Sequence, residues 1–141
     1  MERIIEYKYI LMPFLVWFGI QLFKVSWYYF NETKKWEWSR LFQNGGMPSA
    51  HSAVVTCLST MVLKSEGITS ITFAISVIFT IIVMTDAIGV RRNVGEHARV
   101  LNEIIKNSNK TGIEKLQEIT GHNPVQVFVG ALIGLIVGLI F

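Results

Sequence analysis

The sequence predicts an all-α fold, a polytopic membrane helix bundle of about four transmembrane helices plus a cytoplasmic amphipathic helix. Two observations support this prediction. Hydrophobic residues make up 51% of the 141 residues, and they are gathered into blocks, unlike the spread-out core residues of a soluble domain. The basic residues are concentrated in the stretches between these blocks. We expect residues 1–141 to form a single membrane-embedded domain.

Three of the hydrophobic blocks have the composition of membrane spans. The first, Tyr9 to Phe30, has Pro13 in its first turns, where the missing N–H does least damage. Another, Ile68 to Gly89, carries no charge before Asp86 and is long enough to cross roughly 30 Å of hydrocarbon. The last runs from Pro124 to Phe141.

A further block, Pro48 to Leu63, is shorter and more polar. At about 1.5 Å per residue it reaches only about 24 Å, and it carries several hydroxyl side chains: Ser49, Ser52, Thr56, Ser59 and Thr60. We expect this helix to lie inside the bundle, where its hydroxyls bond to neighbouring helices or to their own carbonyls. Cys57, the one cysteine, lies among apolar residues and indicates buried packing.

Apolar residues recur at helical spacing from Val90 to Asn107, with charged residues around them. This pattern predicts an amphipathic helix that lies on the bundle or on the lipid headgroups. A short helix from about Ile113 to Ile119 is expected next, ended by Gly121. In the last block glycine recurs every four residues, which permits close packing inside the bundle as readily as a homodimer.

The basic residues predict the orientation of the bundle. Four spans place Arg3, Lys8 and Lys64 on one side, and they place all the other lysines and arginines in the long connections on the other side. By the positive-inside rule the long connections face the cytoplasm. The aromatic cluster on that side suits the headgroup level: Trp27, Tyr28, Tyr29, Trp36 and Trp38. The net charge of +3 therefore indicates an anionic membrane surface as partner, and no nucleic acid.

Ionisable residues gather at the cytoplasmic ends of the predicted spans: Lys24, His51, Asp86, Arg91, Arg92 and His122. Ionisable groups that converge at a membrane face are expensive, and they indicate a functional site. A single lysine at the end of a span is usually an anchor at the interface, and a single arginine usually sets topology. It is the convergence of all six that favours function.

The stretch "GGMPSAH", residues 45–51, has the features of an anion site. Pro48 near the first helical position leaves the N–H groups of Ser49 and Ala50 without partners within the helix, and the helix dipole favours an anion there. Two histidines, two arginines and a lysine around a phosphate suit phosphoryl transfer. The cations stabilise the equatorial oxygens, one imidazole attacks phosphorus, and the other protonates the leaving oxygen. This chemistry needs no metal and no other cofactor.

Other interpretations of these residues carry less weight. The stretch at 45–51 is also compatible with a simple turn. His51, His122 and Asp86 have the ligand types of a metal site, but the flanking arginines would repel a cation. His97 lies on the amphipathic helix, apart from the ionisable residues at the ends of the spans, and we interpret it as an interfacial residue.

Three segments resemble the signature blocks of the divergent type-2 phosphatidic-acid phosphatase family, a bacterial and plastid membrane family: "GGMPSAHSAVV", "IVMTDAIGVRRNVGEHARVLNEI" and "GHNPVQVFVGALIG". The upstream "QLFK" is similar to its first element. The family is distantly similar to phosphatidic-acid phosphatases and vanadium haloperoxidases. The resemblance implies that His122 is a nucleophile giving a phosphohistidine, that His51 is the general acid, and that phosphate is held by Ser49, Lys24, Arg91 and Arg92.

The chain departs from the wider pattern in three places. Asn31 stands where an arginine would follow Lys24, and the paired arginines lie about thirty residues before His122, much further than in the wider superfamily. Gln126 replaces the usual carboxylate one turn after His122. Such a carboxylate would fix the histidine tautomer and stabilise its positive charge. We expect Asp86 to take this role in catalysis, with Glu118 as the alternative.

The sequence and the resemblance together predict a metal-independent membrane lipid phosphatase in the bacterial plasma membrane, with its active-site loops in the cytoplasm. The best candidate substrate is phosphatidylglycerophosphate, which is made on that side. Phosphatidic acid and isoprenyl pyrophosphates are the next candidates. Two other functions remain open: a non-catalytic protein that binds anionic lipid headgroups, and a peroxidase that uses vanadate. A homodimer is compatible with each of them.

Overall fold

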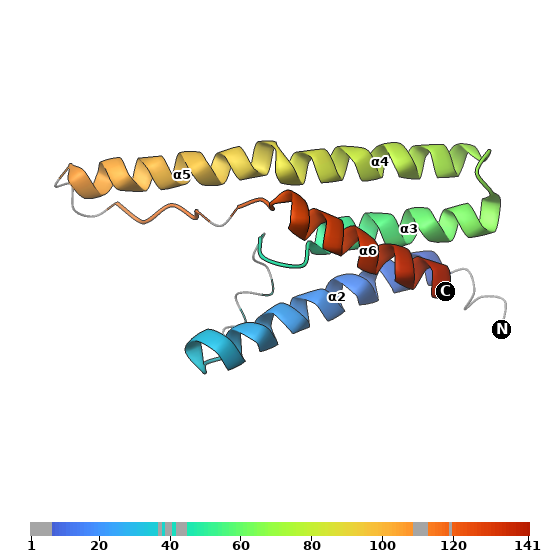
Figure 1. Ribbon diagram of the computed structural model, residues 1–141, viewed down its shortest axis with the longest axis horizontal. Coiled ribbons are helices and arrows are strands. Elements are labelled where there is room, and N and C mark those ends of the chain that lie inside the picture. Colours follow the sequence, from blue (N-terminus) through green and yellow to red (C-terminus); the bar gives the residue numbers. More distant parts are fainter. Residues whose placement is uncertain (1–6, 37, 39–40, 42–44, 109–112, 119) are drawn as a thin grey trace.

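The computed structural model describes residues 7–36, 38, 41, 45–108, 113–118 and 120–141, and every regular element within them is a helix (Figure 1). Two stretches, Lys8–Glu32 and Ile71–Asn107, have the length and hydropathy of membrane spans. The elements are α2 (Lys8–Tyr28), the π-helical turn η1 (Tyr29–Thr33), α3 (Ala50–Glu66), α4 (Ile71–Ile88), α5 (Val90–Asn107) and α6 (Pro124–Ile140). The predicted helical membrane bundle is thus confirmed.

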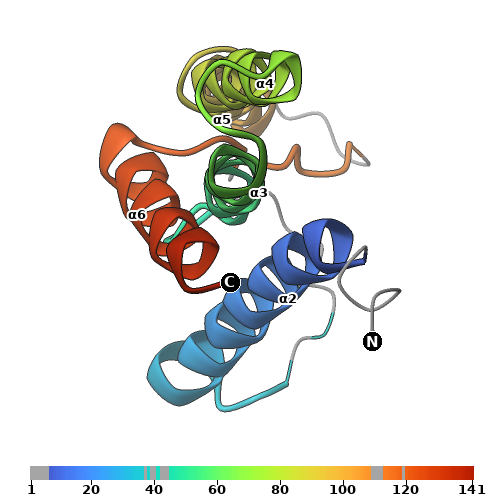
Figure 2. The same ribbon diagram turned by 90° about the vertical axis from the view of Figure 1, so that its right-hand side faces the viewer.

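The most polar of these helices, α3, occupies the centre of the bundle. Figure 2 looks along the helices and shows α2, α4 and α6 arranged around it. The Ser59 hydroxyl donates to the carbonyl oxygen of Ser76 on α4 at 3.0 Å, and the Thr60 hydroxyl donates to the carbonyl of Thr56 at 2.7 Å. The prediction that its hydroxyls bond inside the bundle therefore holds for Ser59 and Thr60, whereas the buried Thr56 hydroxyl has no hydrogen-bond partner among the described residues.

Close packing joins α3 to α6. The glycine face of α6 contacts the backbone of α3, because a Cβ at Gly134 would overlap the carbonyl oxygen of Ala53, and one at Gly138 would lie 2.8 Å from the carbonyl oxygen of Cys57. Cys57 itself is 0% exposed, as predicted. The glycines thus serve packing inside the chain.

The amphipathic helix does not lie on the bundle. Its predicted limits are correct, but α5 continues the line of α4 as one rod (Figure 1). Backbone hydrogen bonds run across the junction, since Gly89 donates to Thr85 at 2.9 Å and accepts from Asn93 at 3.0 Å. Gly89 itself is not helical, with φ −101° and ψ −94°, but these bonds on both sides of it keep α5 in line with α4.

Residues 113–118 return along α5 without forming the predicted helix; Ile119, the last residue of that prediction, lies outside the described residues. The Asn102 side chain on α5 holds this return segment. It donates to the carbonyl oxygen of Leu116 at 2.9 Å and accepts from the Leu116 N–H, also at 2.9 Å. The segment is extended because a side chain, in place of a helical turn, satisfies its backbone groups.

Candidate functional site

The first turn of α3 is capped by Ser49. Its side-chain oxygen accepts from the Ser52 N–H at 3.3 Å and from the Ser52 hydroxyl at 2.9 Å. Its own N–H donates to the carbonyl oxygen of Gln126 on α6 at 3.0 Å, and the residue is 0% exposed. The Ser49 N–H is therefore not available to a phosphate, and the predicted phosphate contact would come from the hydroxyl hydrogen, since the oxygen only accepts in the bonds above. The helix begins at Ala50, so the N–H groups of Ala50 and His51 are the ones that the first turn leaves for an anion.

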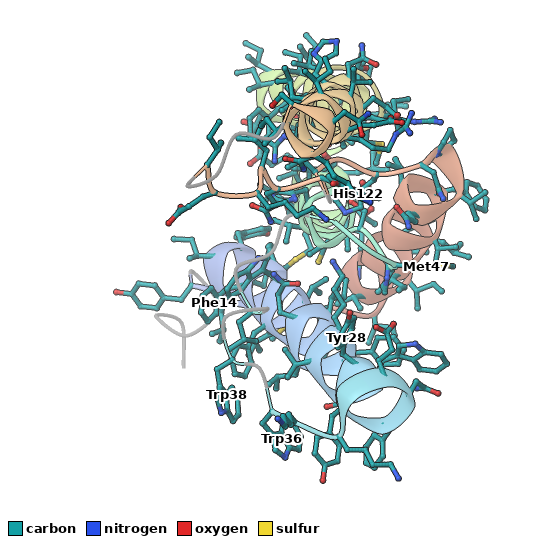
Figure 3. The ribbon with its side chains drawn as sticks, turned by 90° about the vertical axis from the view of Figure 1, so that its left-hand side faces the viewer. Phe14, Tyr28, Trp36, Trp38, Met47 and His122 are labelled. Carbon is teal, nitrogen blue, oxygen red and sulfur yellow. The ribbon has the colours of Figure 1, made fainter. Side chains whose placement is uncertain are left out.

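Two histidines from distant parts of the chain meet beside this turn. The ring centroids of His51 and His122 lie 6.4 Å apart, with the rings inclined at 73°. His51 is in the first turn of α3. His122 precedes α6, and its N–H donates to the carbonyl oxygen of Ala87 at the end of α4, at 2.9 Å. Figure 3 looks onto this end of the bundle and shows His122 near the middle. The separation is short enough for both rings to contact one phosphate.

The environment of His122 keeps its ring neutral. The residue is only 3% exposed, and among the described residues neither Nδ1 nor Nε2 has a hydrogen-bond partner. Burial lowers the pKa of His122 from its ordinary 6.5 to about 4, and nearby positive groups act in the same direction: Lys24, His51 and Arg91. A neutral, buried imidazole with unpartnered nitrogens is suited to act as a nucleophile.

Two cations lie close enough to affect that ring. The Lys24 ammonium, near the end of α2, donates to the carbonyl oxygen of Gly45 at 2.8 Å, so it joins α2 to the glycine loop before α3. The Arg91 guanidinium, in the first turn of α5, forms an ion pair with Asp86 on α4. The predicted site therefore receives one residue or more from each of α2, α3, α4 and α5.

Arg92 is not part of this group. Its side chain is exposed, and it is not among the charges that shift the pKa of His122. Successive residues of an α-helix point about 100° apart, so the neighbouring Arg91 and Arg92 leave the helix in different directions. Of the two predicted phosphate ligands, the structure favours Arg91.

The predicted carboxylate partner of His122 is also corrected. Asp86 bonds to Arg91, and Glu118 accepts from the Asn102 side chain on α5 at 2.8 Å. The Gln126 side chain accepts from the Asn123 N–H at 3.0 Å as part of a capping box at the start of α6. A glutamate would make the same cap, so position 126 has a structural reason to carry either residue.

One buried polar residue was not singled out as a candidate. Gln21 lies on α2 one turn before Lys24 and is 4% exposed, and its Oε1 has no hydrogen-bond partner among the described residues. The signal in the sequence is an amide within an otherwise apolar span, which membranes tolerate only with a partner.

Metal coordination is not favoured by the arrangement. Within the ranges that the structure describes, no three side chains among His, Cys, Asp and Glu are gathered as ligands. Lys24 and Arg91 stand beside the two histidines and would repel a cation, whereas they would attract an anion such as phosphate.

Comparisons with known proteins agree with the resemblance seen in the three motifs. The chain is 42% identical over 122 residues to a Bacillus subtilis (strain 168) protein named "Uncharacterized membrane protein YuiD", and the match covers 77% of each chain. No solved structure matches. Residues 5–137 match the family described as "Divergent PAP2 family". With most of its length matched, the chain belongs to the divergent PAP2 family.

Proposed function

We propose that this chain is a metal-independent membrane lipid phosphatase, which hydrolyses a phosphate monoester on a lipid headgroup at the cytoplasmic face. The observation that carries the proposal is the pair of imidazoles 6.4 Å apart, one of them buried with unpartnered nitrogens, beside two cations. Membership of the family supports the same class of activity.

The reaction proceeds in two steps. A ring nitrogen of His122 attacks phosphorus while the bond from phosphorus to the ester oxygen breaks, and the His51 imidazolium gives its proton to the leaving oxygen. Neutral His51 then takes a proton from water, which attacks phosphorus and breaks the phosphorus–nitrogen bond, releasing orthophosphate. Lys24 and Arg91 stabilise the charge on the equatorial oxygens in both steps.

Grooves beside the site support a lipid as the substrate. One groove of about 420 Å³ lies between α2, α3 and α4 and is lined by apolar side chains and His51. A second, of about 390 Å³, lies between α2, α6 and the Met47–Pro48 segment. Both are lined mainly by apolar residues, so they suit hydrocarbon chains next to a phosphate. We propose phosphatidylglycerophosphate as the best candidate.

The test measures orthophosphate release from phosphatidylglycerophosphate in detergent, with phosphatidic acid and an isoprenyl pyrophosphate as comparison substrates. We expect release to persist in EDTA, to be abolished in His122→Ala and to fall strongly in His51→Ala. Arg92→Ala, on the exposed side of α5, is the matched control and should retain activity. Release that survived both histidine substitutions, or that stopped in EDTA, would contradict the mechanism.

A second function, non-catalytic binding of anionic headgroups, is favoured by one observation: no described carboxylate bonds to His122. Because Gln126 serves a cap, its replacement by glutamate does not separate the two functions. Rapid acid-free quenching with ³²P-labelled substrate distinguishes the two functions. A phosphatase forms a base-stable, acid-labile phosphohistidine, and a protein that only binds headgroups does not. Headgroup binding without any labelled protein would favour the second function.

A further inference from the structure

The covered face of α5 is narrow, since Gly95 and Ala98 are its buried residues. The return segment lies against one side of the helix, where Asn102 contacts Leu116 and where Gly95 leaves space for Thr120: a Cβ at Gly95 would lie 2.8 Å from the Thr120 hydroxyl. Ala98 is 8% exposed on the same side. This side of α5 is fully used inside the chain.

A second apolar face of α5 is open. Val90, Val94, Leu101 and Ile104 are 65%, 51%, 47% and 57% exposed. Together with His97 they form a row whose steps alternate between four and three residues. This is the heptad repeat of a coiled coil, and the charged residues of the helix lie outside the row: Arg92, Glu96, Arg99, Glu103 and Lys106.

The membrane does not cover this row. The continuous helical stretch Ile71–Asn107 has 37 residues and is about 55 Å long, well beyond the roughly 30 Å of hydrocarbon. With α4 in the bilayer, the collinear α5 (Figure 1) projects from it. Beyond Val90, which lies at the membrane face, the apolar row is therefore held outside the hydrocarbon along the helix, which is costly unless another surface covers it.

The glycine face of α6 is not available to a second chain, because α3 occupies it. We propose that the chain forms a homodimer through a parallel two-stranded coiled coil of α5, with the row Val90, Val94, His97, Leu101 and Ile104 at its seam. Two copies inserted in one orientation are related by a two-fold axis along the membrane normal, which brings the same row of each copy face to face.

The heptad positions agree with a two-stranded seam. Val94 and Leu101 occupy the a positions, and Val90, His97 and Ile104 occupy the d positions. Val100 and Ile105 flank the seam and widen its apolar area. The seam covers only about two heptads, but confinement of both copies to one membrane raises their effective concentration and offsets this short length.

Cysteine cross-linking in intact membranes tests the proposal. The chain has one cysteine, which is buried, so Cys57→Ala provides a background. In it, Val94→Cys and Leu101→Cys should each form a disulfide-linked dimer when copper phenanthroline oxidises the two thiols. Glu96→Cys and Arg99→Cys on the outer side are the matched controls, and we expect no dimer from them.

A further variant tests whether the row itself holds the dimer together. Adding Leu101→Asp to the Val94→Cys variant should remove most of the cross-link, whereas adding Glu103→Gln should not. Lack of cross-linking at both positions 94 and 101, or equal cross-linking at 96 and 99, would overturn the proposal. No phosphatase activity is measured, so this outcome is independent of the proposed function.

Discussion

The ion pair between Arg91 and Asp86 gives Asp86 a different role from the one expected. Asp86 lies at the end of an apolar helix and holds the guanidinium, while His122 is positioned by its backbone bond to Ala87. Asp86 is therefore a positioning residue for a cation. No described carboxylate bonds to His122, and burial favours its neutral ring.

Substitution of the two adjacent arginines, Arg91 and Arg92, should show that they contribute differently to activity. We expect Arg91→Ala to lower kcat/KM by about 100-fold, the size of effect seen when one transition-state donor is lost. Arg92→Ala should stay within about twofold of the wild type, as exposed side chains usually do. Initial-rate measurements on phosphatidylglycerophosphate provide both values. Equal losses in the two variants would mean that the assignment of Arg91 alone is wrong.

Because the His122 ring is buried, it should titrate at a lower pH than an ordinary histidine. We expect ¹⁵N-histidine NMR of the free protein to give one ring with a pKa of about 4. Because Lys24 lowers that pKa, Lys24→Met should raise it. The unfolded chain takes up this proton near 6.5 and the folded chain near 4, so stability falls as the pH decreases through this interval. In His122→Gln this part of the acid destabilisation should vanish. A pKa near 6.5 for His122 would contradict the buried site.

At the scale of the helices, local signals predicted more than long-range contacts did. Apolar periodicity gave the limits of α5, and the last apolar block gave the start of α6 at Pro124, because such patterns depend on neighbours along the chain. The helix predicted for the return segment is wrong, because the contact with Asn102 that holds the segment joins residues far apart in the sequence and has no local signal. The same limit explains why Arg91 and Arg92 were not distinguished.

The α3–α6 contact should tolerate no added methyl group. We expect Gly134→Ala to destabilise the protein by about 1–3 kcal/mol, because the new Cβ would force the two backbones apart. Gly19→Ala on α2 is the matched control: a Cβ there meets nothing within 4 Å, and alanine should stabilise the helix by about 0.5–1 kcal/mol. Unfolding titrations in mixed detergent micelles measure both changes. A neutral Gly134→Ala would show that the helices are not in close contact.

At the scale of the whole molecule, the count of four spans provided the decisive prediction from the sequence. It placed the ends of the spans that carry His51 and His122 on one side, and the structure brings these rings to 6.4 Å. Distances within the site could not be predicted, since they depend on how α2 and the α4–α5 rod lean against α3. The orientation of the site in the cell remains a prediction of the positive-inside rule.

Cysteine labelling checks this orientation. In the Cys57→Ala background, we expect Ser65→Cys, in the last turn of α3, to react with a membrane-impermeant maleimide in whole cells. Ser108→Cys, at the far end of α5, should react only after the cells are permeabilised. Both residues are exposed, so access to the thiol depends on the side of the membrane. The reverse pattern would place the site outside the cytoplasm.

Backbone contact between α3 and α6 also determines how the site responds to the bilayer around it. Membranes differ in thickness by a few ångströms, and spanning helices adapt by tilting. Two helices joined through glycine along successive turns tilt as one body, whereas helices joined by long side chains can slide past each other. Since His51 begins one of these helices and His122 directly precedes the other, the spacing of the two imidazoles is preserved while the lipid composition changes.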